Sequence, residues 1–448
     1  MLSNSVSEAL AAIDAALDTL FTLDLSGLSV QDLLAVAARC EKAHRRNTVA
    51  RHDVSHALHQ RPVSEIGGPA YRVLADWLRI TPSEARRRAR VSEPLVERTA
   101  LTGEVLPPRQ PATAEVWREG GLDGEHLRVI QRFLAELPFD VPAAERDAAE
   151  AFLAEHALQL RPDQLARLAD QLAVTLNPDG TFSDEDRARR RGFSWAPQRP
   201  DGMSVGTLVA NPELRSMVDA WFAKFARPGM CNPADQTAVV TGDPVPAQAE
   251  ADTRSPAQRQ HDALSALVRG QLGDPKLGQH NGLPVTVIVS ATLQDLQDRT
   301  GHGVTAGGTL LPMEDVIRMA THAYHYLALF DGVTGQALWL GRTKRIASAD
   351  QRIVLHARDR GCTAPGCTVP GYGCQVHHAA KDWKDGGATN IDALAFACKC
   401  DNLLVENGGW LTKKRKDGTT EWLPPPHLPF PARINTYHHP ERYLPKAE

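Results

Sequence analysis

The sequence predicts an α+β protein with a mostly α-helical N-terminal region, a small mixed α/β subdomain and a compact C-terminal module. Apolar residues recur at helical spacing through roughly the first 190 residues. A β-branched run bounded by proline, at 284–289, predicts a strand in the later half of the chain. The stretch 352–410 holds five of the seven cysteines and an adjacent histidine pair. At 448 residues the chain is long enough for about two to four domains, each with its own core.

The composition is that of an ordinary soluble protein, with 42% hydrophobic and 23% charged residues. No run of ~18 apolar residues occurs, and the first twenty residues lack the basic start and the cleavage site of a signal peptide. We therefore expect neither export nor membrane insertion, and a cytoplasmic location. In a reducing compartment, clustered cysteines are better explained as metal ligands than as disulfides, and their odd number argues against full pairing.

The N-terminal region is expected to fold as successive amphipathic helices, two or three over 6–57 and then one each over 122–137, 142–158 and 162–176. Their apolar stripes, such as Ala9, Ile13 and Leu17 in the first helix, are interpreted as facing a core.

A further helix should begin at Pro82, where Thr81 can cap it and Glu84 can close a capping box. With the preceding 73–80 segment it has the outline of a helix-turn-helix. A solvated basic face is nevertheless favoured over DNA contact, both for this helix and for the basic run that ends 184–191. The helix carries Arg86, Arg87, Arg88 and Arg90.

The middle of the chain alternates between expected helices and short strands. Strand character is expected over 202–210 and 284–289, helices over 212–226, 258–272 and 313–327, and a hairpin from 327–330 and 337–340. No period of 20 to 50 residues indicates a solenoid. The expected organisation is a helical domain at 1–227, a flexible linker at 228–257, a mixed α/β subdomain at 258–341, the cysteine-rich domain at 342–426 and a proline-rich tail at 427–448.

Charge is distributed unevenly along the chain. From Arg342 onward there are 16 Lys and Arg against 11 Asp and Glu, although the whole chain has a net charge of -4. This basic end is compatible with a phosphate-bearing partner such as DNA, and no membrane partner is expected. The residues expected to contact nucleic acid are Arg345, Arg352, Arg358 and Arg360 before the cysteine cluster, and Lys413, Lys414 and Arg415 in a basic hairpin after it.

The cysteines predict a structural zinc site. Cys362 and Cys367 flank a Thr-Ala-Pro-Gly turn that can bring both sulfurs to one ion, which needs about four ligands. Cys398 and Cys400 cannot both face one ion from a regular helix, whereas Cys398 and Asp401 lie at i and i+3. We expect zinc on Cys362, Cys367 and Cys398. The fourth ligand stays open among Asp401, Cys400 and Cys374, and the competing interpretation is a core of reduced cysteines.

The histidine pair predicts a second site. His377 and His378 lie on an apparently extended segment, 374–379, where neighbouring side chains point to opposite faces. One imidazole could therefore bind a metal while the other takes a proton. A second pair, His438 and His439, is interpreted as surface residues.

These motifs resemble the HNH nuclease module of actinobacterial proteins. In that family, called the 13E12 repeat family, the module follows a helical "domain of unknown function 222", and the resemblance covers nearly the whole chain. It implies a ββα-metal fold, in which a zinc-stapled hairpin carries a histidine and precedes a helix, and it implies DNA as the partner. The residues that carry the resemblance are Arg358-Asp359-Arg360-Gly361-Cys362, Pro365-Gly366-Cys367, Cys374-Gln375-Val376-His377-His378, Trp383, Gly386-Gly387, Leu394, Cys398 and Gly408-Gly409-Trp410.

The resemblance also implies roles for individual residues. His378 would be the general base, while His377 and Asn402 would hold a catalytic divalent ion, Mg²⁺ or another, beside the structural zinc. The chain has Ala393 where the family has its central asparagine; Asp392 is the nearby candidate for a catalytic role.

The last turn of the motif also differs, because Asp401 and Asn402 replace two adjacent histidines. The sequence thus predicts an HNH-type metal-dependent endonuclease-like protein, weakened by these changes. The alternatives are a non-catalytic DNA-binding or regulatory protein that keeps the zinc fold, and a protein-interaction scaffold.

Overall fold

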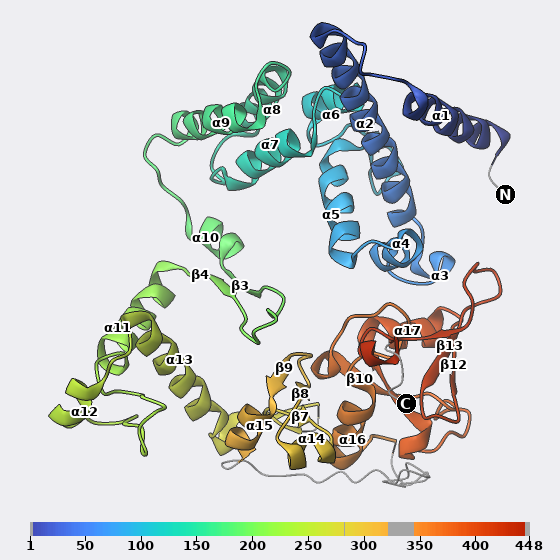
Figure 1. The fold of residues 1–448 in the computed structure, drawn as a ribbon. Coiled ribbons are helices and arrows are strands. Elements are labelled where there is room, and N and C mark those ends of the chain that lie inside the picture. Colours follow the sequence, from blue (N-terminus) through green and yellow to red (C-terminus); the bar gives the residue numbers. More distant parts are fainter. Residues whose placement is uncertain (1–2, 282, 321–344, 444–448) are drawn as a thin grey trace. The chain divides into compact units, whose positions relative to one another are not determined.

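The computed structural model describes residues 3–281, 283–320 and 345–443 (Figure 1). It divides into two compact units. The first consists of residues 1–57 and 86–181, and the second of residues 58–85 and 182–448. Residues 58–85 therefore belong with the C-terminal part of the chain, although they lie inside the expected helical domain.

The first unit is helical, as the apolar spacing predicted. Its core is formed by large buried side chains such as Trp117, Ile130 and Leu153. The side chain of Asp123 caps a central helix by accepting hydrogen bonds from the backbone N–H groups of two residues in its first turn. The unit contains α1 (Asn4–Thr22), α2 (Val30–His59, to residue 57), α5 (Pro82–Ser92, from residue 86), β1 (Arg98–Thr99), β2 (Val105–Leu106), α6 (Pro111–Arg118), α7 (Gly124–Glu136), α8 (Ala143–His156) and α9 (Pro162–Leu176).

The first helix departs from expectation. The stripe that includes Ile13 and Leu17 does not face a core, because α1 has no buried residue. On α2 the buried residues begin only at Val49. The core of the unit thus reaches the C-terminal half of α2 and leaves the N-terminal helix outside it.

The second unit begins with two short helices, α3 (Val63–Ile66) and α4 (Ala70–Leu78), and the start of α5. Helix α5 begins at Pro82 as predicted, since the Thr81 hydroxyl accepts a hydrogen bond from the Glu84 backbone N–H at 3.1 Å. The preceding helix ends at Arg79, whose φ of 53° is left-handed. The helix-turn-helix outline is present, but its first helix packs against the C-terminal module.

The next part of this unit is more ordered than the linker expected at 228–257. Arg254 forms ion pairs with Asp252 and Asp262, both at 2.7 to 2.8 Å, and donates to the Met230 carbonyl at 2.8 Å. These contacts hold the loop to the following helix. The elements are α10 (Asp184–Arg190), β3 (Gly192–Trp195), β4 (Gly206–Val209), α11 (Pro212–Phe225), α12 (Pro246–Ala251) and α13 (Pro256–Leu272).

The strand expected over 284–289 is mostly absent, which corrects the sequence prediction. The Tyr372 hydroxyl donates to the Thr286 carbonyl at 2.8 Å and accepts from the Ile288 N–H at 3.0 Å. The Tyr372 hydroxyl thus forms the hydrogen bonds that a neighbouring strand would have formed with these two backbone groups. The expected hairpin at 327–340 lies outside the described residues. The region contains β5 (Gln279–His280), β6 (Leu283–Pro284), β7 (Val289–Ser290), α14 (Leu293–Asp298), β8 (His302–Thr305), β9 (Leu310–Pro312) and α15 (Met313–Ala320).

The C-terminal module follows α16 (Ala349–Asp359), whose N-cap Ser348 closes a capping box. β10 (Cys374–His378) and β11 (Leu394–Cys398) form an antiparallel pair in which His377 lies opposite Ala395. α17 (Lys399–Asn407) follows directly. A second sheet contains β12 (Leu411–Lys414), β13 (Thr420–Leu423) and β14 (Arg433–Ile434). The first two of these strands form the expected basic hairpin.

The tail packs over this module. The Asn435 side-chain amide donates to the carbonyls of Cys362 and Cys367 at 2.7 and 2.8 Å. His438 lies against Gly361, where an added Cβ would meet the imidazole ring. Burial lowers the pKa of His438 to about 4. This histidine is therefore a packing residue, whereas the sequence placed it on the surface.

Candidate metal centre and histidine pair

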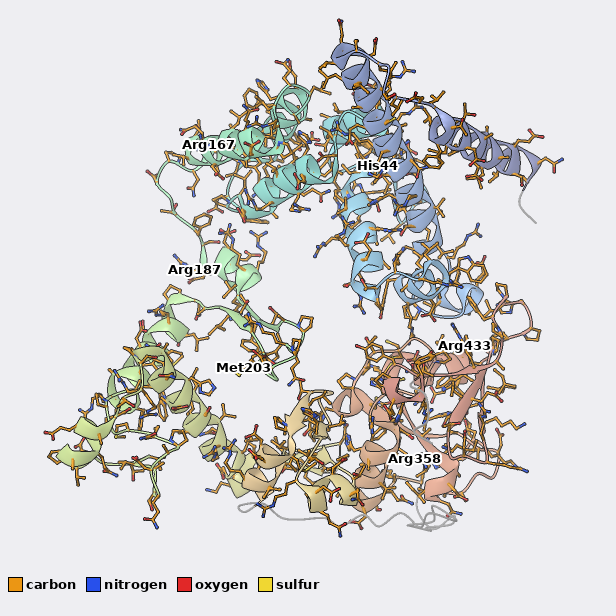
Figure 2. The ribbon with its side chains drawn as sticks, in the orientation of Figure 1. His44, Arg167, Arg187, Met203, Arg358 and Arg433 are labelled. Atoms are coloured by element: carbon orange, nitrogen blue, oxygen red, sulfur yellow. The ribbon has the colours of Figure 1, made fainter. Side chains whose placement is uncertain are left out.

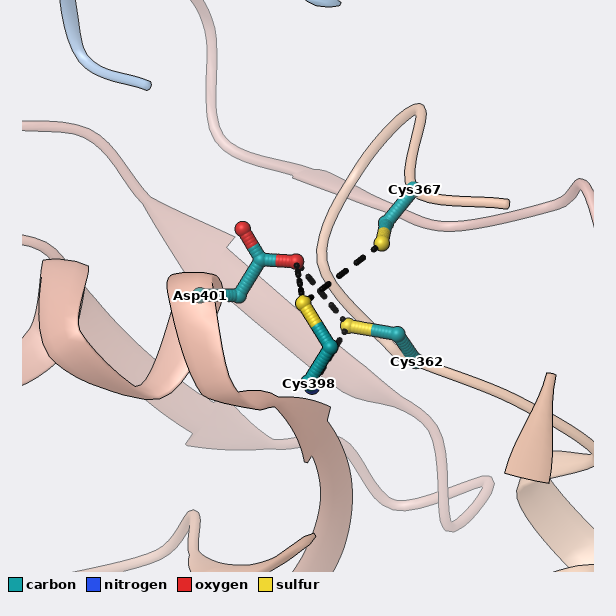
Figure 3. Close-up of side chains that lie close together, drawn as sticks. All are labelled: Cys362, Cys367, Cys398 and Asp401. Atoms are coloured by element: carbon teal, nitrogen blue, oxygen red, sulfur yellow. Dashed lines mark hydrogen bonds between the residues drawn. The ribbon is translucent and has the colours of Figure 1, made fainter. Parts of the chain in front are cut away.

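Three cysteines and one aspartate converge at the junction between β11 and α17 (Figure 3). Cys398 is the N-cap of α17, and Asp401 lies one turn into that helix. Cys362 and Cys367 come from the preceding turn, where the Cys362 backbone N–H donates to Val369 and Gly366 has a φ of +68°. The four ligand atoms all lie within 4.8 Å of one another, and all four residues are buried.

The geometry of this cluster fits a structural zinc ion. The sulfurs of Cys367 and Cys398 are 3.9 Å apart, close to the ~3.8 Å edge of a tetrahedron with Zn–S bonds of ~2.3 Å. Asp401 Oδ2 lies 3.1 Å from both Cys362 Sγ and Cys398 Sγ. Hydrogen bonds from the other two thiols lower the pKa of Cys398, whereas burial raises the pKa of Cys362. The cluster therefore presents soft donors to a metal ion.

The structure also separates the three candidates for the fourth ligand. Asp401 belongs to the cluster. Cys400 is exposed, and the buried Cys374 directs its sulfur to the Pro370 carbonyl at 3.4 Å. The i, i+3 relation to Cys398 was the sequence signal that pointed to Asp401.

A buried arginine from the distant α4 neutralises this cluster. Arg72 Nη1 donates to Asp401 Oδ2 at 2.7 Å, and Nη2 donates to Oδ1 of the same carboxylate. Burial alone would lower the pKa of Arg72, but the hydrogen bonds and charge of Asp401 outweigh it and raise the pKa. A zinc ion with three thiolates and one carboxylate would carry a formal charge of about -2, which this guanidinium would offset in part. No sequence signal links these residues, which are 329 positions apart.

Further contacts fix α3 and α4 to the module. The Trp410 indole donates to the Gly67 carbonyl at 3.0 Å. Arg433, labelled in Figure 2, pairs with Asp76 at 2.7 Å. Gly67 has a φ of +84°, and an added Cβ would lie 2.4 Å from Leu428. Residues 63–78 are therefore a structural part of the C-terminal module.

His377 forms a defined hydrogen-bond network. The Thr412 hydroxyl lies 2.9 Å from the Ala379 carbonyl and 3.0 Å from His377 Nε2. If its single proton goes to the carbonyl, His377 carries its own proton on Nε2 and has a lone pair on Nδ1. Burial lowers the pKa of His377 to about 4, so the ring is neutral near pH 7.

On its other edge, His377 faces Asn402. Asn402 Oδ1 lies 3.0 Å from His377 Nδ1. A ring protonated on Nδ1 would donate to this oxygen, whereas a ring protonated on Nε2 would bring two lone pairs together and would need a turned amide or a cation between the two atoms. β10 and α17 thus bring together the two residues that the sequence had assigned to a catalytic ion.

His378 points to a different partner. Its Nε2 lies 3.1 Å from the Thr389 hydroxyl, which is within 3.4 Å of the Arg345 carbonyl. If the hydroxyl donates to that carbonyl, His378 carries its proton on Nε2 and keeps Nδ1 as an acceptor. Burial also lowers the pKa of His378. Thr389 was missed by sequence reasoning, and its place two residues after the Gly386-Gly387 turn was the available signal.

The resemblance placed the family's central asparagine at Ala393, with Asp392 as the nearby candidate for a catalytic role. The Ala393 carbonyl accepts from the N–H groups of Ala379 and Ala380 at 2.8 and 3.1 Å, so its backbone closes the turn after the histidines. Asp392 is exposed, and its charge acts on Lys414. Within the described ranges, no hydrogen bond joins Asp392 to either histidine, and Thr389 is the group placed to orient His378.

The basic residues fall into two groups. Lys414 donates to the Leu394 and Gly418 carbonyls, and burial lowers its pKa to about 8. Arg358 pairs with Asp359, and Arg360 pairs with Glu441 (Figure 2). Arg352 is half-buried, and burial lowers its pKa. The side chains expected to bind phosphate that are exposed are Arg345, Lys413 and Arg415.

Sequence comparison gives the chain a family. The model described as "Domain of unknown function (DUF222)" matches residues 34–359. The chain belongs to the DUF222 family. The matched DUF222 region includes Arg72 and ends three residues before Cys362. No solved structure matches this DUF222 protein.

Relatives of this DUF222 protein extend over the metal cluster as well. The uncharacterized protein Rv1945 of Mycobacterium tuberculosis is 50% identical over 98% of this chain and 96% of its own length. The uncharacterized protein Mb1179c of Mycobacterium bovis is 49% identical with the same coverage. Among the described residues, no helix is both long and apolar enough to cross a membrane.

Proposed function

We propose that this DUF222 protein is an HNH-type, metal-dependent endonuclease that hydrolyses DNA phosphodiester bonds. The observation that carries the proposal is the opposition of His377 Nδ1 and Asn402 Oδ1 at 3.0 Å, which leaves two metal-ligand atoms facing each other when the histidine proton is on Nε2. Two cis ligands of an octahedral ion with bonds of ~2.1 Å are separated by ~3.0 Å. The spacing therefore supports a divalent ion held by these two side chains.

The residues of the chain would divide the chemistry between them. His378, neutral because its pKa is lowered, would take a proton on Nδ1 from the water that attacks phosphorus. Thr389 would hold the opposite edge of that ring. A bound divalent ion would stabilise negative charge on the phosphate and on the leaving oxygen. One imidazole nitrogen and one amide oxygen suit Mn²⁺ or another transition ion better than Mg²⁺, which prefers oxygen ligands.

The zinc cluster has a structural role in this proposal. Asp401 precedes Asn402 directly, so a metal ion on Cys398 and Asp401 would fix the start of α17 and hold Asn402 facing β10. The cluster needs reduced cysteines, and a cytoplasmic location is part of the proposal for that reason.

Plasmid nicking tests the proposal. The purified full chain is incubated with supercoiled plasmid and Mn²⁺ or Mg²⁺, beside His378→Ala and the control His302→Ala, which alters an exposed histidine on β8. We expect nicking by the wild type and the control, and its loss in His378→Ala. Equal activity of wild type and His378→Ala, or none with any divalent ion, would refute the enzyme proposal.

A second candidate function, non-catalytic DNA binding, is favoured by a different observation. In the described part of the chain, the group of three or more His, Cys, Asp or Glu that meets metal-binding geometry is the zinc cluster. In the same described part, His377 and His378 do not belong to a group of three such ligands. Binding to duplex DNA that weakens with salt, without cleavage, would support this candidate, and Lys413→Ala should reduce the salt slope by ~1.

A further inference from the structure

The N-terminal helix α1, dark blue in Figure 1, carries an apolar seam that the described structure does not bury. Five of its six large apolar residues follow one another at intervals of four, three, four and three positions, which is the spacing of a coiled-coil heptad. These five are Val6, Leu10, Ile13, Leu17 and Leu20, each between 42% and 50% exposed. The sixth, Phe21, lies beside the seam and is 80% exposed.

We propose that this seam associates with α1 helices of further copies of the same chain, in parallel orientation. A helix that packs on a globular core carries a wider stripe with a period of 3.6 residues. A strict 3.5-residue repeat instead fits another helix that carries the same repeat. A second copy supplies that helix, since every layer of the seam then meets its own equivalent.

The exposed apolar area of α1 is that of a weak contact. Its six large apolar residues are each at least 42% exposed. Together they leave on the order of 600 Å² accessible, at the upper end for the largest apolar patch of a typical monomer and below the ~800 Å² that each partner buries in a standard interface.

Charge decides the orientation. Asp14 occupies heptad position e, beside the seam. In a parallel pair it faces Ala9 of the second copy, which occupies position g, whereas in an antiparallel pair it would face the second copy's Asp14. Because α1 contains acidic residues and no basic ones, only the parallel arrangement avoids like charges across the seam.

The seam residues also indicate the number of copies. Leu10 and Leu17 occupy position a, while position d holds Val6, Ile13 and Leu20. Leucine at a with isoleucine at the central d position favours three or four strands over two. α1 spans only about 28 Å, so the association should depend on concentration.

The mass of the full chain in solution tests the proposal. Light scattering after size exclusion should give three to four times the 48.8 kDa of one chain, and Leu10→Glu/Leu17→Glu should give the monomer. The matched control Ala15→Glu/Thr22→Glu places the same charges on the opposite face and should keep the oligomer. A monomeric wild type, or an oligomer that survives Leu10→Glu/Leu17→Glu, overturns the proposal. A monomer whose α1 amides resist hydrogen exchange would show that another part of the same chain covers the seam.

Crosslinking tests the orientation separately. In a background with the exposed Cys40 and Cys400 replaced by serine, Val6→Cys chains should form disulfide-linked pairs with one another. Crosslinks that appear only when Val6→Cys chains are mixed with Leu20→Cys chains would overturn the parallel arrangement.

Discussion

Replacing Arg72 by methionine should destabilise the metal-free module far more than the metal-loaded one. Both partners of the Arg72–Asp401 pair are buried, and Asp401 has no exposed surface. Methionine keeps an apolar stem but removes the two donated hydrogen bonds. Breaking a buried ion pair from one side costs ~3–5 kcal/mol, because the remaining charge is uncompensated.

A metal ion should offset most of this loss. Zinc bound to Asp401 neutralises the same carboxylate as Arg72, so the two contributions cannot simply add. The free energy gained on zinc binding is therefore expected to be larger in Arg72→Met than in the wild type. Zinc binding should gain more free energy in Arg72→Met because zinc and Arg72 act on the same atom: the Asp401 oxygen nearest the cysteine sulfurs also accepts a hydrogen bond from Arg72.

Urea unfolding with and without a chelator measures this difference. Tryptophan fluorescence reports on the module, because Trp410 and Trp422 are buried in its core. The matched control is Arg433→Met, which breaks the half-exposed pair with Asp76 and should cost ~1 kcal/mol or less in both states. An equal loss for Arg72→Met with and without metal would refute the electrostatic argument and leave packing as the cause.

Three further predictions follow from the same site. Metal analysis should find about one zinc per chain. Cys398→Ala should lose this zinc, whereas Cys400→Ala, which changes an exposed cysteine, should keep it. Zinc retained in Cys398→Ala would contradict the assignment of the ligands. Burial lowers the pKa of His377 to about 4, so its stabilising contribution is complete above about pH 6.5 and is lost as pH falls through about 4. In chelated protein, His377→Gln should therefore flatten the acid loss of stability by up to ~3 kcal/mol in urea titrations; an unchanged slope would count against it. Thr389→Val should lower the cleavage rate ~10 to 100-fold with little change in KM, measured on a labelled duplex, and an unaffected rate would mean that the hydroxyl does not position His378.

Local sequence signals predicted the parts that depend on neighbouring residues. The helix at Pro82 follows from its cap at Thr81, and the helices of the first unit follow from apolar spacing. The cysteine turn and the i, i+3 relation of Cys398 and Asp401 likewise predicted the metal cluster. Within each half of the cluster the deciding groups lie close together in the chain, whereas the two halves are 31 to 39 positions apart.

Predictions from the sequence were wrong where residues distant in the chain form hydrogen bonds with the backbone or the charged group concerned. The run at 284–289 has strong strand propensity, yet the Tyr372 hydroxyl occupies its hydrogen-bonding groups. Lys414 looked like a phosphate contact, but carbonyls of its own module take its ammonium. α1 shows the opposite case, because its periodic stripe is present while the described core does not reach it.

The sequence by itself determined the residue types of the candidate site and their local spacing: cysteine and aspartate donors, and adjacent histidines on a strand. Only the tertiary structure decided that Arg72 pairs with Asp401 of the cluster and that Thr389 lies against His378. The physical reason is that burial and charge compensation depend on which segments pack together. Those contacts join residues that lie from 11 to 329 positions apart in the chain.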